Sequence, residues 1–414
     1  MKADLVITNA RLVDHSGEQR GAIAVSCGRI AAIGGNDAMP PAERTIDAGG
    51  RVVMPGVIDP HCHLGVNYDF DEDIRTETAG AARGGVTTIL LFARSMEQRY
   101  VPYYWDRRER GERGAVVDFG FHFGIQKAEH VSEIAEIAEQ TGVQTFKCHM
   151  GYEVGNSIGI HSSPDSWVFA AMREAAKLPR GVVAVHCENT ELVELLKPEM
   201  KATGRGDLAA YSESRPPFVE EEAIERMIHL AEITGCPLYV VHTTVAAGPT
   251  MAAAARVRGI DVWIETCPHY LTRTAYDADL GTTAKISPPL RDRTQLDGLW
   301  EGMLNGQIST LGTDHVPFKK NGGELPVGAA ADAALRRAPA RDVAAAVVGA
   351  QLLQPGQAFR PASQEGLAVR GRRRGPGHDR PGRGADRRAP VRQGHLPVRG
   401  LEAQGLAGAH RVAW

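Results

Sequence analysis

The chain of 414 residues lacks the sequence features of secreted, membrane-embedded and nucleic-acid-binding proteins. Its start has no apolar core of the kind that a signal peptide needs, and no apolar run approaches membrane-spanning length. The formal net charge is only -3, so no excess of one sign points to nucleic acid or a lipid surface. We therefore expect a cytoplasmic protein with neither a nucleic-acid nor a membrane partner.

Cysteine is scarce and shows no pairing pattern. No two cysteines stand in a Cys-x-x-Cys spacing, and their density is too low for a disulfide framework. They are residues 27, 62, 148, 187, 236 and 267. Free thiols in a reducing compartment are therefore expected.

Residues 321–414 contain no Lys, Ile, Met, Thr, Tyr or Cys. This tail carries 15 Arg against 7 acidic residues, a net charge of +8, whereas residues 1–320 carry 32 basic and 43 acidic residues and stand at -11. So abrupt a change marks a boundary. A segment built mainly from Arg, Ala, Gly and Pro is not expected to form a core, so we predict a poorly ordered tail.

Short apolar segments separated by Gly, Asn and Asp predict strands near the start of the chain. These segments are residues 5–13, 22–25, 29–35, 45–47 and 51–54. They predict a small β-sandwich over residues 1–54. Because a few strands bury little apolar surface, this sandwich needs further strands or a packing partner, and we expect it to be incomplete.

From residue 55 onward, apolar strands alternate with helical patterns eight times. The predicted strands are residues 57–63, 86–92, 116–124, 143–149, 182–187, 237–242, 260–266 and 308–313. The clearest helical patterns are residues 129–140, 165–178, 190–203, 219–235 and 293–305, and the glycines placed as helix C-caps are Gly142, Gly181, Gly235 and Gly259. Eight alternating units predict an α/β fold with a closed (β/α)8 TIM barrel over residues 55–320.

Six polar side chains stand at or near the carboxyl ends of five predicted strands, where barrel enzymes carry their chemistry. They are His61, His63, Lys147, His186, His242 and Asp314. Each alone has an ordinary explanation, such as a hydrogen-bonded core histidine or a helix-capping aspartate. Their joint occurrence at one mouth of the barrel instead predicts a metal site.

His61 and His63 stand one residue apart on a strand, so their side chains face the same side and can bind one ion together. Asp59 has the same parity and is expected to orient the two imidazoles as an acceptor. Lys147 is unusual because an ammonium group cannot bind a metal. Its neutral amine can react with carbon dioxide to form a carbamate, an anionic donor that can bridge two cations. His149 has the parity of Lys147 and is expected as a neighbour of the site.

These residues resemble the binuclear amidohydrolase superfamily and, more narrowly, the cyclic amidohydrolases: dihydropyrimidinase, hydantoinase, allantoinase and dihydroorotase. The resemblance extends over residues 1–320, and its matching segments are residues 55–61, 84–88, 186–189, 214–217, 287–291 and 312–315. It implies two divalent ions, normally zinc, in a protein that is often a homotetramer. One ion would be held by His61, His63, Lys147 and Asp314, and the other by His186, His242 and Lys147, with Lys147 carboxylated.

The resemblance also implies roles in catalysis. Tyr152 stands five residues after Lys147, at the spacing of the tyrosine that stabilises the oxyanion in the hydantoinase and dihydropyrimidinase branch. Ser287 matches the position whose backbone holds the substrate ring. Asp314 would accept a proton from the attacking water and pass it to the leaving nitrogen.

Two motifs disagree about the substrate. Residues 267–270, Cys-Pro-His-Tyr, look like allantoinase or dihydroorotase, whereas Tyr152 and residues 211–216 look like hydantoinase or dihydropyrimidinase. No arginine follows His63 to hold a substrate carboxylate, which argues for a neutral ring. Because Tyr152 acts on the reacting atoms, we predict opening of a hydantoin or dihydropyrimidine ring. An allantoinase-like or dihydroorotase-like hydrolase is the alternative.

The family pattern is not legible after the eighth strand. We expect that residues from about 325 onward are read in a shifted frame of a GC-rich gene, with a natural disordered tail as the alternative. Reading the coding DNA in its other frames distinguishes the two. A shifted frame would leave every metal ligand in place but remove partners of the N-terminal strands, so a poorly stable, inactive remnant is the competing interpretation of the chain.

Overall fold

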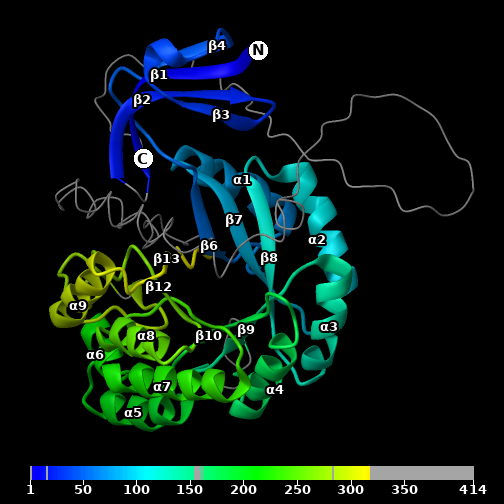
Figure 1. The fold of residues 1–414 in the computed structure, drawn as a ribbon. Helices are drawn as coiled ribbons and strands as arrows, with labels where there is room; N and C mark the ends of the chain where they lie inside the picture. The colour runs from blue at the N-terminus through cyan, green and yellow to red at the C-terminus, as the bar shows by residue number, and fades with distance from the viewer. Residues whose placement is uncertain (1, 15–16, 153–159, 161, 282–283, 318–414) are drawn as a thin grey trace, which may run out of the picture. The chain divides into compact units, whose positions relative to one another are not determined.

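The computed structural model describes residues 2–14, 17–152, 160, 162–281 and 284–317, and the predicted tail lies outside these described residues (Figure 1). The described residues fall into two compact units, one that reaches Gly56 and one that begins at Val57. Within these ranges, no helix combines the length and apolar character that crossing a bilayer requires.

The first unit is a five-stranded sheet built around one long strand. Its strands are β1 (Ala3–Asp14), β2 (Gly17–Ser26), β3 (Arg29–Gly34), β4 (Ala42–Asp47) and β5 (Val52–Val53), with a single 3-10 turn η1 (Asn36–Ala38) between β3 and β4. The strand β1 pairs antiparallel with β2 and parallel with β4 and β5, and β3 pairs with β2. Where a β-sandwich was predicted, the described residues form this one sheet.

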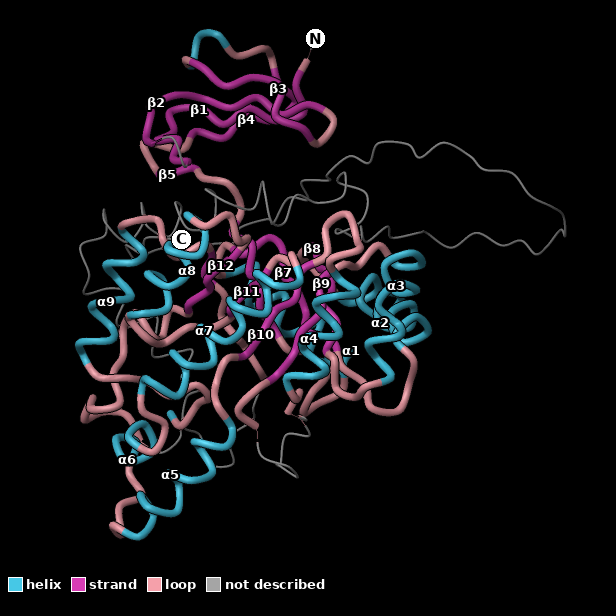
Figure 2. The backbone as a smooth tube through the Cα atoms, turned by 60° about the horizontal axis from the view of Figure 1, so that its bottom comes forward, coloured by secondary structure: helices cyan, strands magenta, loops and turns pink. Residues whose placement is uncertain are grey.

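The second unit is the predicted barrel, with its strands enclosed by helices (Figures 1 and 2). The strands are β6 (Val57–Cys62), β7 (Val86–Ala93), β8 (Asp118–Gly124), β9 (Thr145–His149), β10 (Val182–His186), β11 (Leu238–Val240), β12 (Val262–Thr266) and β13 (Thr310–Leu311). Each strand pairs in parallel with the next, in chain order. The sheet closes where Cys62 bridges to His315 and the His63 N–H donates to the His315 carbonyl at 2.8 Å. This confirms the TIM-barrel prediction.

The described helices are α1 (Phe70–Arg83), α2 (Tyr100–Gly114), α3 (Glu129–Thr141), α4 (Asp165–Ala175), α5 (Thr190–Ala202), α6 (Leu208–Glu213), α7 (Pro217–Thr234), α8 (Ala247–Val257) and α9 (Arg293–Leu304). Five of the described helices, α3, α4, α5, α7 and α9, agree with the predicted helical ranges to within three residues at each end, and the ranges of the other four were not predicted. Gly142 and Gly235 end α3 and α7 in the left-handed conformation, as predicted. Gly181 is not a C-cap, because α4 ends earlier. Position 181 nevertheless requires glycine, because a Cβ there would lie 1.8 Å from the Ala175 carbonyl oxygen.

Side chains alternate between the barrel interior and the helices along each strand. On β10, Val183 and Val185 belong to the core beneath the helices, whereas Val182 and Ala184 belong to a separate cluster inside the barrel. His186 continues the inward series at the strand end. The same alternation turns Lys147 on β9 inward, because its neighbours Phe146 and Cys148 belong to the outer core.

Candidate metal centre

Three ligand-type side chains gather where the barrel closes. His61 and His63 lie at the end of β6, and Asp314 follows β13. The two Nε2 atoms lie 3.2 Å apart, and Asp314 Oδ1 lies 3.1 Å from that of His61 and 3.0 Å from that of His63. All three ligand atoms fall within 4.8 Å of one another, so this group can hold a metal ion.

The His61 ring is held by Glu265, a residue that the sequence analysis did not single out. Glu265 Oε1 lies 2.6 Å from His61 Nδ1 and accepts the backbone N–H of His242 at 2.9 Å, while Tyr239 donates to Oε2. When Nδ1 donates to this carboxylate, Nε2 keeps its lone pair for a metal. The available signal was a glutamate within a predicted barrel strand, since a buried carboxylate needs a partner.

The hydrogen bonds of Asp59 differ from the role that was predicted for it. Its carboxylate accepts the backbone N–H of His61 at 3.1 Å, and it accepts the N–H and hydroxyl of Thr313 at 3.0 and 2.6 Å. The prediction that Asp59 orients the two imidazoles is therefore wrong. Because Thr313 stands directly before Asp314, the carboxylate instead ties β6 to the segment that carries Asp314.

A second histidine pair lies at the ends of β10 and β11. His186 Nδ1 and His242 Nε2 are 3.0 Å apart, and the His242 ring stacks on the His61 ring with centroids 5.5 Å apart. Alternation from Leu238 and Val240, which pack beneath the helices, would send His242 to that outer face. Its left-handed backbone, with φ of 40°, turns the side chain into the barrel mouth instead.

Glu188 orients the other side of His186. Its Oε2 lies 2.8 Å from His186 Nε2 and accepts the Ser287 hydroxyl at 2.8 Å, so Nδ1 of His186 faces His242. Arg215 Nε lies 3.8 Å from the second oxygen of this fully buried carboxylate. The hydrogen bond from Ser287 to Glu188 brings Ser287, the expected substrate-binding residue, beside the second histidine pair.

Lys147 is 1 % exposed, and its Nζ has no hydrogen-bond partner among the described residues. It lies 5.0 Å from the ring centroid of Phe92, whose ring in turn lies 4.4 Å from that of His61. Burial lowers the pKa of Lys147 to about 8, although Asp314 and Glu265 oppose this shift. Within the described chain, the salt bridge that would explain a buried ammonium is not formed. An orphaned amine with a lowered pKa fits the predicted carbamate.

Burial keeps three of the four histidine rings neutral, as metal ligands must be. It lowers the pKa of His63 to about 4, and it lowers the pKa of His186 and of His242. At His61 the two adjacent carboxylates outweigh burial and raise the pKa to about 9. They therefore favour positive charge at His61, carried either by a proton or by a metal ion.

Tyr152 lies beside the second histidine pair, where its ring centroid is 4.8 Å from that of His186. Burial raises the pKa of this phenol well above its usual range, so Tyr152 keeps its proton and can donate a hydrogen bond to an oxyanion. His149 contacts Tyr152 edge-on at 5.8 Å, and its Nδ1 lies 3.2 Å from Gln126 Nε2. His149 is thus a neighbour of the site, as expected.

Comparison with known proteins gives the family. No family model matches the chain. The chain is 33% identical over 323 residues to an allantoinase of Deinococcus radiodurans, which covers 77% of this chain and 70% of the relative. It is 33% identical over 323 residues to a D-hydantoinase of Ralstonia pickettii, which covers 75% of this chain and 68% of the relative.

A solved structure of an L-hydantoinase (dihydropyrimidinase) from Arthrobacter aurescens is similar to this fold. Its TM-score is 0.69 at 32% identity, and the match covers 76% of this chain and 69% of that chain. These similarities confirm the resemblance stated from the motifs. The chain therefore belongs to the cyclic amidohydrolases of the hydantoinase, dihydropyrimidinase and allantoinase branch, enzymes that hydrolyse C–N bonds in cyclic amides.

Proposed function

We propose that the site binds two divalent cations, with zinc as the best-suited metal, and opens a hydantoin or dihydropyrimidine ring by hydrolysis. Imidazole nitrogens and carboxylate oxygens are suitable zinc ligands. The observation that carries the proposal is the pair of histidine groups that meet at the stacked rings of His61 and His242, with the orphaned amine of Lys147 buried beside them.

The ligand sets follow from the two groups. His61, His63 and Asp314 would hold one ion, and His186 with His242 the other. Lys147 would serve both as a carbamate: its Nζ attacks carbon dioxide, loses a proton and leaves two carboxylate oxygens. Burial favours this reaction because it raises the share of neutral amine.

The bound cations would lower the pKa of a water molecule and polarise the ring carbonyl. The protein's own groups complete the reaction. Asp314 would accept the proton of the attacking water at a carboxylate oxygen and deliver it to the departing ring nitrogen. Tyr152 would donate its hydroxyl hydrogen bond to the carbonyl oxygen as negative charge develops there. The backbone of Ser287 would hold the ring.

The test is hydrolysis of hydantoin, dihydrouracil and allantoin by the zinc-loaded full chain, together with metal analysis. We expect about two zinc ions per chain and turnover of hydantoin or dihydrouracil, with weaker turnover of allantoin. Turnover of none of the three amides by a folded, zinc-loaded chain would contradict the proposal and favour an inactive remnant.

Allantoinase activity is the second candidate. It is favoured by the Cys267–Tyr270 motif and by relatives named allantoinase, including one that is 37% identical over 331 residues, from Solibacter usitatus. The motif lies directly after β12, and the ring centroids of His269 and Tyr270 are 4.2 Å apart. If allantoin is hydrolysed at least about tenfold faster than hydantoin, this candidate replaces the first.

A further inference from the structure

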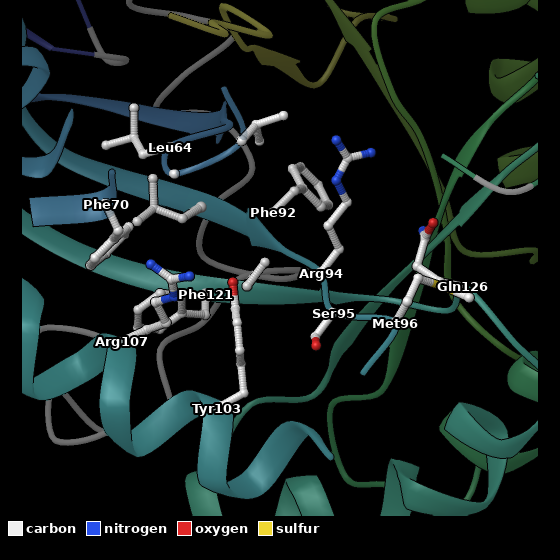
Figure 3. Close-up of a pocket in the computed structure, with 14 residues that line it drawn as sticks. Leu64, Phe70, Phe92, Arg94, Ser95, Met96, Tyr103, Arg107, Phe121 and Gln126 are labelled. Carbon is white, nitrogen blue, oxygen red and sulfur yellow. The ribbon is translucent and has the colours of Figure 1, made fainter. Parts of the chain in front are cut away.

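A cavity of about 230 Å³ adjoins the metal centre beyond the end of β7. Figure 3 shows Arg94 rising from the end of this strand beside Phe92, while Arg107 and Tyr103 come from α2. Phe92 is a wall common to the cavity and the metal centre, since its ring contacts that of His61 with centroids 4.4 Å apart. A group bound in the cavity would therefore lie one side chain away from the candidate ligands.

The charge of the cavity has one sign. Among the described residues that line it, two arginines from different elements contribute full charges and no carboxylate does. Arg107 stacks on Phe70 and Tyr103, with its guanidinium carbon 4.7 and 4.9 Å from the two ring centroids. Its buried Nε has no hydrogen-bond partner in the part of the chain that the structure describes. The lining thus supplies positive charge at a partly desolvated position, where an anion is attracted strongly.

Arg94 adds to this field from the opposite wall. Burial lowers its pKa, and the groups whose charges oppose this shift are the phenols of Tyr152, Tyr103 and Tyr100. Tyr152, the residue proposed to stabilise the oxyanion, is thus one of the groups whose charge acts on Arg94.

The rest of the lining suits a short hydrocarbon stem. Leu64, Phe70, Leu91 and Phe121 provide apolar walls, and Gln126 provides a neutral amide. Pockets of this kind bind by apolar contact and fix orientation with a few polar groups. Because Leu64 directly follows His63, the apolar wall begins where the metal ligands end.

We infer that this cavity binds the carboxylate of a ring substituent, so that the preferred substrate is a cyclic amide with an acidic side chain. The inference rests on the proposed function for the ring chemistry and adds the class of substituent. It differs from the sequence-based expectation, which looked for a cation directly after His63 and, finding none, favoured a neutral substrate. The structure supplies the cations from β7 and α2 instead.

The test compares two matched hydantoins with the zinc-loaded full chain: one bears a 2-carboxyethyl group at ring position 5 and the other the neutral 2-carbamoylethyl group. We expect kcat/KM to favour the acid by about tenfold or more, since paired charges contribute more than neutral hydrogen bonds. Arg94→Met and Arg107→Met should each bring this ratio towards one, and Arg94→Lys should retain part of it. Arg113→Met should leave the ratio unchanged, because Arg113 lies on α2 outside the cavity lining and pairs with Glu109 at the surface.

Calorimetric binding of the two hydantoins separates this inference from the proposed function. If no ring is hydrolysed but the acid binds about tenfold tighter than the amide, and Arg94→Met removes the difference, the ring chemistry fails and the cavity assignment stands. If the wild-type chain binds and hydrolyses acid and amide alike, the cavity assignment fails. Inorganic phosphate and acetate are titrated in parallel. If they bind through Arg94 while the acid gains nothing over the amide, the cavity takes a free anion and the inference is overturned.

Discussion

The two histidine pairs of the site have the same ring chemistry but different charge. His61 and His63 share the Asp314 carboxylate at 3.1 and 3.0 Å. His186 and His242 face each other at 3.0 Å through Nδ1 and Nε2, and Glu188 Oε2 lies 2.8 Å from the other ring nitrogen of His186, Nε2. The first pair therefore has an anionic candidate ligand beside it, whereas the second pair offers two neutral nitrogens.

Under the proposed two-cation function, this difference gives a reason for the lysine on β9, which lies between the strands that carry the two histidine pairs. Two divalent cations in a buried site need nearby negative charge to offset the loss of hydration. Asp314 would supply it for one position only. As an ammonium group Lys147 would repel both cations, but as a carbamate it would supply an anionic oxygen to each. The second pair should therefore depend on the modified lysine more strongly than the first.

Removing the Asp314 carboxylate should have the largest effect. Asp314→Asn keeps the size of the side chain but abolishes both the anionic ligand and the proton acceptor. We expect kcat to fall by about 10⁴-fold, at the upper end for a general base, and zinc content to drop at the first position. Steady-state kinetics with metal analysis measures both. A variant that keeps two zinc ions and loses less than about tenfold in kcat would show that Asp314 is neither ligand nor base.

Removing the lysine should separate the two pairs. Lys147→Ala should leave at most one zinc ion per chain, at the Asp314 position, and lower kcat by about 10³-fold because one cation is lost. Propionate should restore zinc and part of the activity by placing a carboxylate in the vacated space, whereas propionamide should not. Equal loss of zinc from both positions, with no rescue by propionate, would contradict the unequal dependence of the two pairs.

Much of this site was accessible from the sequence, because strand alternation is a rule of backbone geometry. It predicted that His61, His63 and Lys147 face the barrel interior. Their inward direction and the barrel order that brings β6 to β13 follow from periodicity and from right-handed βα connections. The prediction that Gly181 caps a helix failed, because α4 ends at Ala175. A glycine is needed there because a Cβ would lie too close to the Ala175 backbone.

Other features depend on contacts that no local pattern encodes. His242 has the parity of an outward side chain, and only its positive φ brings it to the site. Asp59 has the correct parity but its partner is Thr313, which is distant in the chain. Glu265 and Arg94 were missed because neither belongs to a histidine motif. Their roles follow from neighbours on other strands and on α2, which only the assembled barrel defines.

A variant of Tyr152 would test whether the oxyanion forms beside the second histidine pair, His186 and His242. Tyr152→Phe keeps the ring against His186 but removes the hydroxyl. We expect kcat to fall by about 10²-fold, the usual cost of losing one oxyanion donor, while KM and zinc content stay close to wild type. Steady-state kinetics and metal analysis distinguish this from a ligand. A loss of zinc in this variant would mean that Tyr152 supports the metal site and not the transition state.

The smallest effects should come from the two carboxylates that hold histidine rings, and they offer the sharpest comparison of the pairs. Glu265→Gln should weaken zinc binding at the His61 position, and Glu188→Gln at the His186 position, each by about tenfold, because an amide holds an imidazole N–H less strongly than a carboxylate does. Competition with a chelator measures the affinity of each position.

Glu265 also accepts the His242 backbone N–H, at 2.9 Å, so its variant should disturb the second position slightly, whereas Glu188→Gln should leave the first unchanged. If both variants weaken both positions equally, the two ions bind as one cooperative unit and the contrast between the histidine pairs does not govern metal affinity.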